Sequence, residues 1–93
     1  MSDVVRRVLV ASTGEDVVPV LATARRLRDD GLEVVYLGTG ATAEQVAHAA
    51  VAEDVVEVHL AGPAAGAARV EALLASLQAA VAHVTPVADR PGD

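Results

Sequence analysis

The side chains of this sequence best suited to chemistry are its histidines and a short run of hydroxyl residues. His48, His59 and His83 fall in three different predicted elements, and none has a second histidine four residues away to share a metal. Ser12 and Thr13 have no neighbouring base in the sequence that would activate a hydroxyl nucleophile. We therefore predict no catalytic residue, no metal site and a protein that is not itself an enzyme.

Composition excludes several further classes of function. The 93 residues include 20 alanines and 18 valines, a single aromatic residue, no lysine and no cysteine. Without lysine there is no Schiff-base or P-loop chemistry, and without cysteine there is no thiolate nucleophile. A net charge of −6 and the lack of stacking side chains argue against nucleic acid as a partner. The first ten residues resemble neither a secretory signal nor a membrane span, so we predict a cytoplasmic protein without membrane partners.

Two kinds of segment alternate along the chain and position these residues. Short apolar runs rich in β-branched residues predict four strands, at residues 7–11, 33–37, 55–60 and 83–87. Pro86 lacks a backbone N–H and therefore predicts that the last strand lies at an edge of the sheet.

Apolar residues at helical spacing predict three helices between these strands. The first begins after Asp16, a predicted cap, and stops at Gly31, and the second opens with a capping box of Thr42 and Gln45 and ends near residues 53–54. The third shows the clearest spacing and is expected to press its leucines on the sheet. The residues of that spacing are Val70, Leu73, Leu74, Leu77 and Val81.

This alternation predicts one α/β domain over residues 1–93, with a core at about 6–87 and a tail at 88–93. Its four parallel strands are expected in the order 2-1-3-4, flanked by three helices. In such a sheet a ligand binds at the carboxyl ends of strands one and three. The candidate pocket residues there are Thr13, Gly14, Asp16, Gly38, Ala61 and Gly62.

Four passages, residues 6–11, 24–31, 32–38 and 42–46, resemble the cobalamin-binding domain of methylmalonyl-CoA mutase and its relatives. The resemblance runs from about Arg6 to Leu77 and implies a flavodoxin-like three-layer sandwich. It also implies that Asp16 corresponds to the aspartate of the family's Asp-x-His-x-x-Gly motif, whose histidine is the lower ligand of cobalt in adenosylcobalamin.

The sequence departs from the family where cobalamin is held. Val18 stands at the position of the histidine and Leu21 at that of the glycine, and valine has no lone pair for cobalt. A serine-rich turn of the family is replaced by the residues at 61–64, and the last strand and helix of the family are missing. We therefore predict no cofactor, with cobalamin as the alternative.

The missing helix predicts an uncovered surface on strands three and four. A sheet covered on both faces does not accommodate charged residues in an interior strand, yet the third strand contains Glu57 and His59. We predict that this surface joins two copies of the chain in a homodimer. Its residues are Glu57, His59, His83 and Thr85, with Val55 and Val87 adding apolar area.

The sequence as a whole favours a stand-alone, degenerate cobalamin-binding-like domain that acts as a non-catalytic protein-interaction or assembly module. Besides a second copy, its partner would be a mutase-like or assembly subunit. Two alternatives stay open at this point: a cobalamin-binding subunit of an acyl-CoA mutase, accessory to that isomerase, and a small-ligand sensor that uses the pocket above Gly14 and Gly62.

Overall fold

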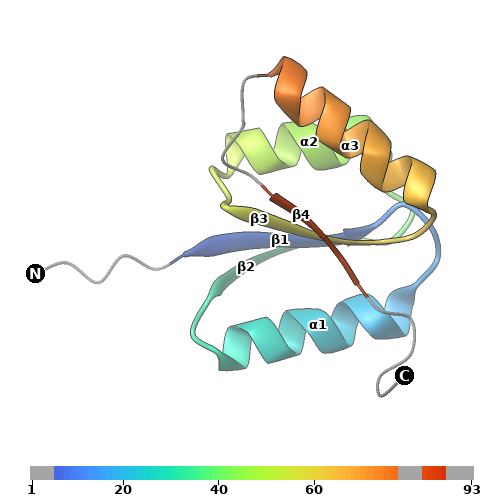
Figure 1. Ribbon diagram of the computed structural model, residues 1–93. Helices are drawn as coiled ribbons and strands as arrows, with labels where there is room; N and C mark the ends of the chain where they lie inside the picture. The colour runs from blue at the N-terminus through green and yellow to red at the C-terminus, as the bar shows by residue number, and fades with distance from the viewer. Residues whose placement is uncertain (1–5, 78–82, 88–93) are drawn as a thin grey trace, which may run out of the picture.

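The computed structural model describes residues 6–77 and 83–87, in which strands and helices alternate as the sequence predicts (Figure 1). All strand pairs are parallel, and the order β2-β1-β3-β4 confirms the predicted flavodoxin-like α/β arrangement. The strands are β1 (Arg7–Ser12), β2 (Glu33–Gly38), β3 (Glu57–Ala61) and β4 (His83–Pro86). The helices of the described residues are α1 (Val17–Asp29), α2 (Ala43–Ala52) and α3 (Ala64–Ser76).

The sheet separates two hydrophobic clusters of unequal size. Helix α1 covers one face of the sheet, called the α1 face below, and α2 and α3 lie side by side on the opposite α2/α3 face (Figure 1). Alternation in β1 supplies both clusters, since Leu9 contacts the α2/α3 cluster while Val8 and Val10 contact the α1 cluster. All three side chains are fully buried, as expected of the central strand of a covered sheet.

Local signals at the helix ends are partly as predicted. The Thr42 hydroxyl accepts from the Gln45 amide at 3.0 Å and the Gln45 side chain accepts from the Thr42 amide at 2.9 Å, which confirms the capping box. Gly31 follows α1 with a φ of +90°, a conformation that suits glycine. Asp16 occupies the N-cap position of α1 as predicted, but its side chain bonds to no amide of the helix and instead accepts a hydrogen bond from Ser12.

The predicted contact of the third helix with the sheet is wrong at Leu77. Helix α3 ends at Ser76, and Leu77 at its C-terminus is 40% exposed, whereas Val70 and Leu74 are buried. Leu73 packs at the margin of the α2/α3 cluster. Residue 81, which the spacing also placed in this helix, lies outside the described residues.

The bounds of β3 and β4 differ slightly from those predicted. Strand β3 starts at Glu57 rather than at residue 55, although the Val56 amide already donates to the Arg7 carbonyl at 2.9 Å. Strand β4 is at the edge, as Pro86 predicts, and its pairing with β3 extends to Val87, whose amide donates to the Leu60 carbonyl at 3.0 Å.

Candidate functional site

The loop after β1 meets the loop after β3 at the carboxyl ends of the strands, where the sequence places the candidate pocket. The Thr13 amide donates to the Ala61 carbonyl at 3.2 Å, and the Gly14 carbonyl accepts from the Gly40 amide at 2.8 Å. The loops after β1, β2 and β3 are therefore joined to one another by their own backbone groups. Amides and carbonyls that would contact a ligand in an open crevice are already paired here.

Thr13 fills the space between the first and third strands. A Cβ atom added to Gly62 would lie 2.5 Å from Thr13 Oγ1, and one added to Gly66 would lie 2.6 Å from the same oxygen. Gly62 also has a φ of +110°, so glycine at this position provides both the turn and the room for the threonine. The crevice at the switch point of the sheet is thus packed by the protein itself.

The hydroxyl that fills the crevice has no hydrogen-bond partner. Thr13 Oγ1 is buried and unpaired among the described residues. A buried hydroxyl without a partner costs free energy, and this oxygen is enclosed between Gly62 and Gly66, where an added methyl group would already collide with it. We therefore regard Thr13 as a packing residue.

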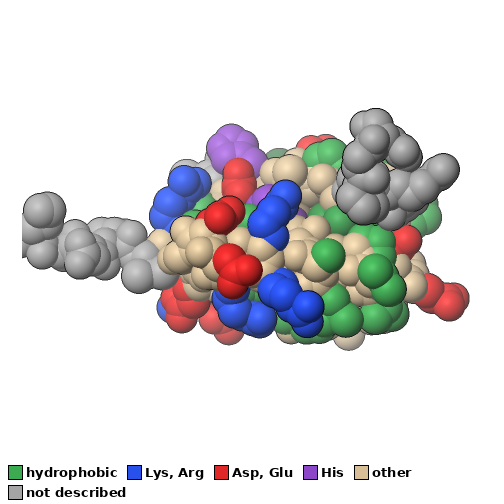
Figure 2. Space-filling model, turned by 90° about the horizontal axis from the view of Figure 1, so that it is seen from below, with side chains coloured by type: hydrophobic (Ala, Val, Ile, Leu, Met, Phe, Trp, Pro, Cys, Tyr) green, Lys and Arg blue, Asp and Glu red, His purple; other side chains and the backbone are tan. Residues whose placement is uncertain are grey.

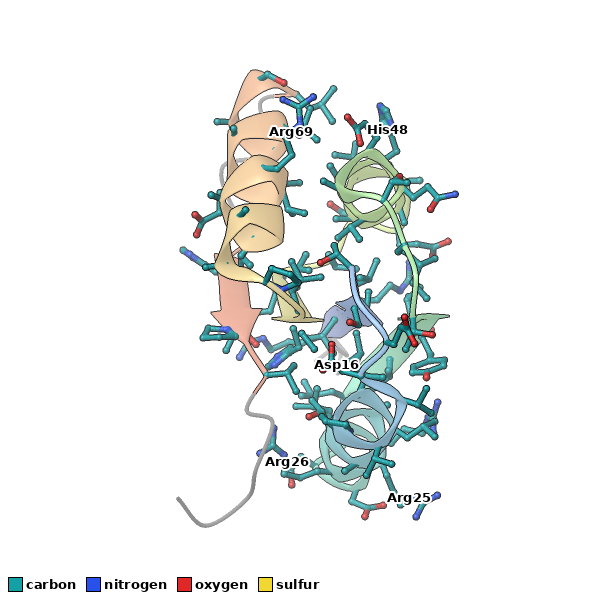
Figure 3. All side chains as sticks on the ribbon, turned by 90° about the vertical axis from the view of Figure 1, so that its right-hand side faces the viewer. Asp16, Arg25, Arg26, His48 and Arg69 are labelled. Carbon is teal, nitrogen blue, oxygen red and sulfur yellow. The ribbon has the colours of Figure 1, made fainter. Side chains whose placement is uncertain are left out.

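The acidic residues that follow Thr13 make the loop unsuited to anions. Ser12 Oγ donates to Asp16 Oδ2 at 2.9 Å and accepts from the Gly14 amide at 2.8 Å. Figure 3 shows Asp16 at the start of α1, beside the sheet. The Asp16 carboxylate stands at the N-cap position of α1, with Glu15 before it in the sequence, and so brings negative charge to the amides that would otherwise attract a phosphate.

Gly38, another predicted pocket residue, is not part of this contact. It pairs with Ala11 at the outer end of β2, and a Cβ atom added to it would meet only the Tyr36 ring, at 3.8 Å. Its φ of +91° indicates a turn role. Of the six predicted pocket residues, five are thus brought together at the end of β1 and β3, and Gly38 lies apart.

A hollow of about 680 Å³ lies beside α2, at a place that the sequence did not predict. It lies between the end of β2 and one side of α2, and Glu44 and His48 line it one helical turn apart. Arg69 of α3 donates to Glu44 at 3.0 Å, and this hydrogen bond holds the pKa of Glu44 below its ordinary value. The remaining lining residues are Leu37, Thr39, Gly40, Ala41 and Gln45. The hollow is wide and its charged groups are exposed, so it offers no desolvated acid or base.

No group of three metal-ligating side chains occurs in residues 6–77 and 83–87. His48 points outward from α2 (Figure 3), while His59 and His83 belong to β3 and β4.

The four predicted interface residues lie on one side of the α1 face, and three of them reach its surface. Glu57 pairs in register with His83, and His59 with Thr85, so these side chains share the face on which α1 lies. His83 is exposed and Glu57 and Thr85 are half-buried, but His59 is only 8% exposed. Glu57 Oε1 lies 2.9 Å from His59 Nε2, so the two groups satisfy each other within one chain.

The prediction that Val55 adds apolar area to this surface is wrong. Val55 is 2% exposed and packs in the α2/α3 cluster, on the opposite face of the sheet, because it precedes β3 and turns with the chain there. Val87 does pack at the margin of the α1 cluster. Figure 3 shows Arg26 extending from α1 on the side of β4, so a cation also stands at this border.

The exposed apolar side chains gather instead on the side of β2. Among residues 6–77 and 83–87, five of the seven large ones come from the start of α1 and the end of β2. Figure 2 shows hydrophobic atoms concentrated at the end of the molecule where α1 begins. These five are Val17, Val18, Leu21, Tyr36 and Leu37, between 37% and 76% exposed. We call them the β2 patch. The signal for it in the sequence is the single aromatic residue of the chain, Tyr36.

The described residues do not fit cobalamin. Val18, at the position of the ligand histidine, is 76% exposed and has no donor atom, and the crevice that would admit the cofactor is filled by Thr13 against Gly62 and Gly66. We derive no chemistry through that cofactor.

Comparison with known proteins adds no identification. No protein-family model matches the chain. No curated protein matches it either. Within the described part of the chain, every helix is too short or too polar to cross a bilayer.

Proposed function

We propose that this chain is a non-catalytic protein-interaction or assembly module that forms a homodimer, derived from a cobalamin-binding-like domain that no longer carries its cofactor. The observation that carries the proposal is the packed crevice. Where a flavodoxin-like sheet binds ligands, Thr13 contacts two glycines and the loop backbones bond to one another.

The surface supports binding of a protein rather than of a small molecule. The β2 patch is apolar and lies on one side of the molecule, where burial against a second protein would remove it from water. The resemblance to methylmalonyl-CoA mutase, the mutase-like partner and the cytoplasmic location stay predictions of the sequence.

Purified protein tests the proposal against the two alternatives. Titration with adenosylcobalamin is expected to leave the spectrum of the free cofactor unchanged, because Val18 offers cobalt no lone pair. Light scattering at tens of micromolar is expected to report twice the monomer mass of 9.4 kDa. Replacing Val18 with His serves as the matched variant, since it restores the missing ligand at an exposed position.

Stoichiometric binding of cobalamin with a histidine-bound spectrum by the wild-type chain would overturn the proposal in favour of a cofactor carrier. A rise in melting temperature with a small nucleotide or sugar phosphate, together with a monomeric mass, would favour the sensor.

A further inference from the structure

The two edges of the sheet differ in what they offer a neighbouring strand. In β2 the Glu33 amide donates inward to the Arg6 carbonyl at 2.9 Å. Because successive residues of a strand alternate, Val34 and Tyr36 turn their N–H and C=O groups outward. No strand of the described residues lies beside them.

The β4 edge is blocked at the corresponding place. The His83 amide donates inward to the Val56 carbonyl at 3.2 Å, so the outward positions of β4 are Val84 and Pro86. Proline has no N–H, and it is a common device that prevents pairing at an edge. Only β2 therefore presents two outward donors together with two outward acceptors.

Apolar side chains of the β2 patch flank this open edge on both faces. Tyr36 pairs in register with Val10 of the α1 cluster and so lies on the α1 face. Leu21 lies one helical turn before Arg25, which Figure 3 shows on the side of α1 away from β4. Leu37 lines the hollow beside α2 and lies on the α2/α3 face. An edge strand with unpaired backbone groups and apolar flanks is a site for strand addition.

The geometry points to a second copy of this chain as the occupant: two β2 strands pair antiparallel about a two-fold axis at Val35 and join the two sheets into one. This inference rests on the proposed assembly function and names its surface. It moves the interface from the predicted side of β3 and β4 to the opposite edge of the sheet.

The register about Val35 satisfies the outward groups of both strands. Val34 faces Tyr36 of the second copy, and each such pair exchanges two hydrogen bonds, as outward-facing residues of antiparallel strands do. Val35 faces Val35 as a non-hydrogen-bonded pair, and valine beside tyrosine is a favourable cross-strand combination on the α1 face. Glu33 faces Leu37, so the register places no two like charges opposite each other.

Charge and space along the junction of the two β2 strands are also compatible with the pairing. Arg7 Nε binds Glu33 Oε1 at 2.9 Å, and Figure 3 shows Arg25 extending from α1 on the side away from Arg26. The Glu33 carboxylate is therefore paired with the Arg7 guanidinium, and Arg25 adds a second cation beside β2, although the chain as a whole is acidic. The two β1 strands would lie about 14 Å apart, three strand spacings, so the α1 helices beneath them do not collide, and Leu21 and Tyr36 fill the gap.

A cysteine at the axis tests the register directly, because the chain has no cysteine of its own. Across a non-hydrogen-bonded pair the Cα atoms lie about 4.5 Å apart, which a disulfide bridges. Val35→Cys is expected to form a disulfide-linked dimer under mild oxidation. Leu37→Cys is the matched control on the same face. Leu37 is 37% exposed, but in this register the Cα atoms of the two residues 37 would lie about 14 Å apart.

We expect the Val35 variant to cross-link at least about ten times faster than the Leu37 variant, because only the Val35 variant meets disulfide geometry. Equal rates, or faster cross-linking of the more exposed Leu37 variant, would overturn the register.

A proline at the outward position tests the edge itself. Tyr36→Pro removes an outward N–H without removing an inward one, whereas Tyr36→Ala removes the side chain and keeps the N–H. Light scattering on the proline variant is expected to report a monomer, with circular dichroism that matches the wild type. The alanine variant is expected to retain a measurable dimer fraction. If the proline variant does not fold, the cysteine pair decides.

His83→Asp probes the rival surface and is expected to leave the dimer intact. A dimer that survives Tyr36→Pro and is lost in His83→Asp overturns this inference and keeps the assembly function. A wild-type chain that stays monomeric overturns the inference and the homodimer, and binding of cobalamin by a dimeric chain overturns the proposed function alone.

Discussion

The two faces of the sheet are covered to different extents, and the difference explains where polar residues are tolerated. On the α2/α3 face two helices lie side by side, and apolar residues of every strand, from Val35 on β2 to Val84 on β4, contact their cluster. On the α1 face one helix covers the centre, and the border at β3 and β4 contains the Glu57–His59 pair and exposed His83.

One helix does not span four strands, because strands repeat at about 4.8 Å while a helix with its side chains is about 10 Å wide. The α1 face therefore stays open at both edges, with charged and imidazole groups at β4 and most of the β2 patch at the other side, while Leu37 of that patch lies on the opposite face. The fully covered face supplies stability, and the partly covered face supplies the surfaces available for binding.

The largest expected effect is on the fully covered face. Leu74→Ala is expected to lower the free energy of unfolding by about 2–5 kcal/mol, because Leu74 is 3% exposed and its loss leaves a cavity between α3 and the sheet. Urea denaturation measures it. The matched control is Leu77→Ala, in the same helix region but 40% exposed, for which we expect a loss within about 0.5 kcal/mol. Equal losses would mean that α3 presents a different side to the sheet.

The next effect concerns the contact of Thr13 with Gly62 at the carboxyl ends of β1 and β3. Gly62→Ala is expected to cost about 1–3 kcal/mol, since the residue has a positive φ and its Cβ would contact Thr13. Gly31→Ala is the control, because Gly31 has a φ of +90° with no atom near its Cβ position. Thermal unfolding should rank Gly62→Ala as the more damaging change. The reverse order would show that Thr13 does not fill the crevice.

A smaller effect is expected at the border of the α1 face. Glu57→Ala removes the acceptor of the nearly buried His59 and is expected to cost about 1 kcal/mol. His83→Ala, the register neighbour of Glu57, is exposed and should change stability by less than about 0.5 kcal/mol. Chemical denaturation at neutral pH compares the two variants, and a harmless Glu57→Ala would contradict the proposed pairing.

The smallest effect concerns the ion pair between Arg69 of α3 and Glu44 of α2, on the fully covered face. Arg69→Ala is expected to raise the pKa of Glu44 toward its ordinary value, because the hydrogen bond from Arg69 is the main cause of the lowering. A lowered pKa in the folded state stabilises only above the ordinary pKa of Glu and is lost as the pH falls through the folded value. Both side chains are exposed, so we expect no measurable change in stability at neutral pH.

An NMR titration of the Glu44 carboxyl checks this shift, with Arg25→Ala on α1 as the control. An unchanged pKa in the Arg69 variant would mean that the ion pair does not form in solution.

The order of strands and helices, and with it the topology, could be read from the sequence because the signals are local. Apolar runs define β1 and β3, and hydrogen bonds within one turn define the capping box of Thr42 and Gln45. Pro86 predicted an edge strand for the same reason, since the missing N–H is a property of the residue itself.

Which side chains are buried was decided only by the tertiary structure. Leu74 and Leu77 belong to one apolar pattern, yet only Leu74 meets the sheet because the helix ends at Ser76. Tyr36 and Val10 are neighbours in register, and only Tyr36 is exposed, because β2 is an edge strand with a neighbouring strand on one side only, whereas β1 lies between two strands. Burial depends on which elements lie opposite a residue, and that is fixed by contacts between segments far apart in the sequence.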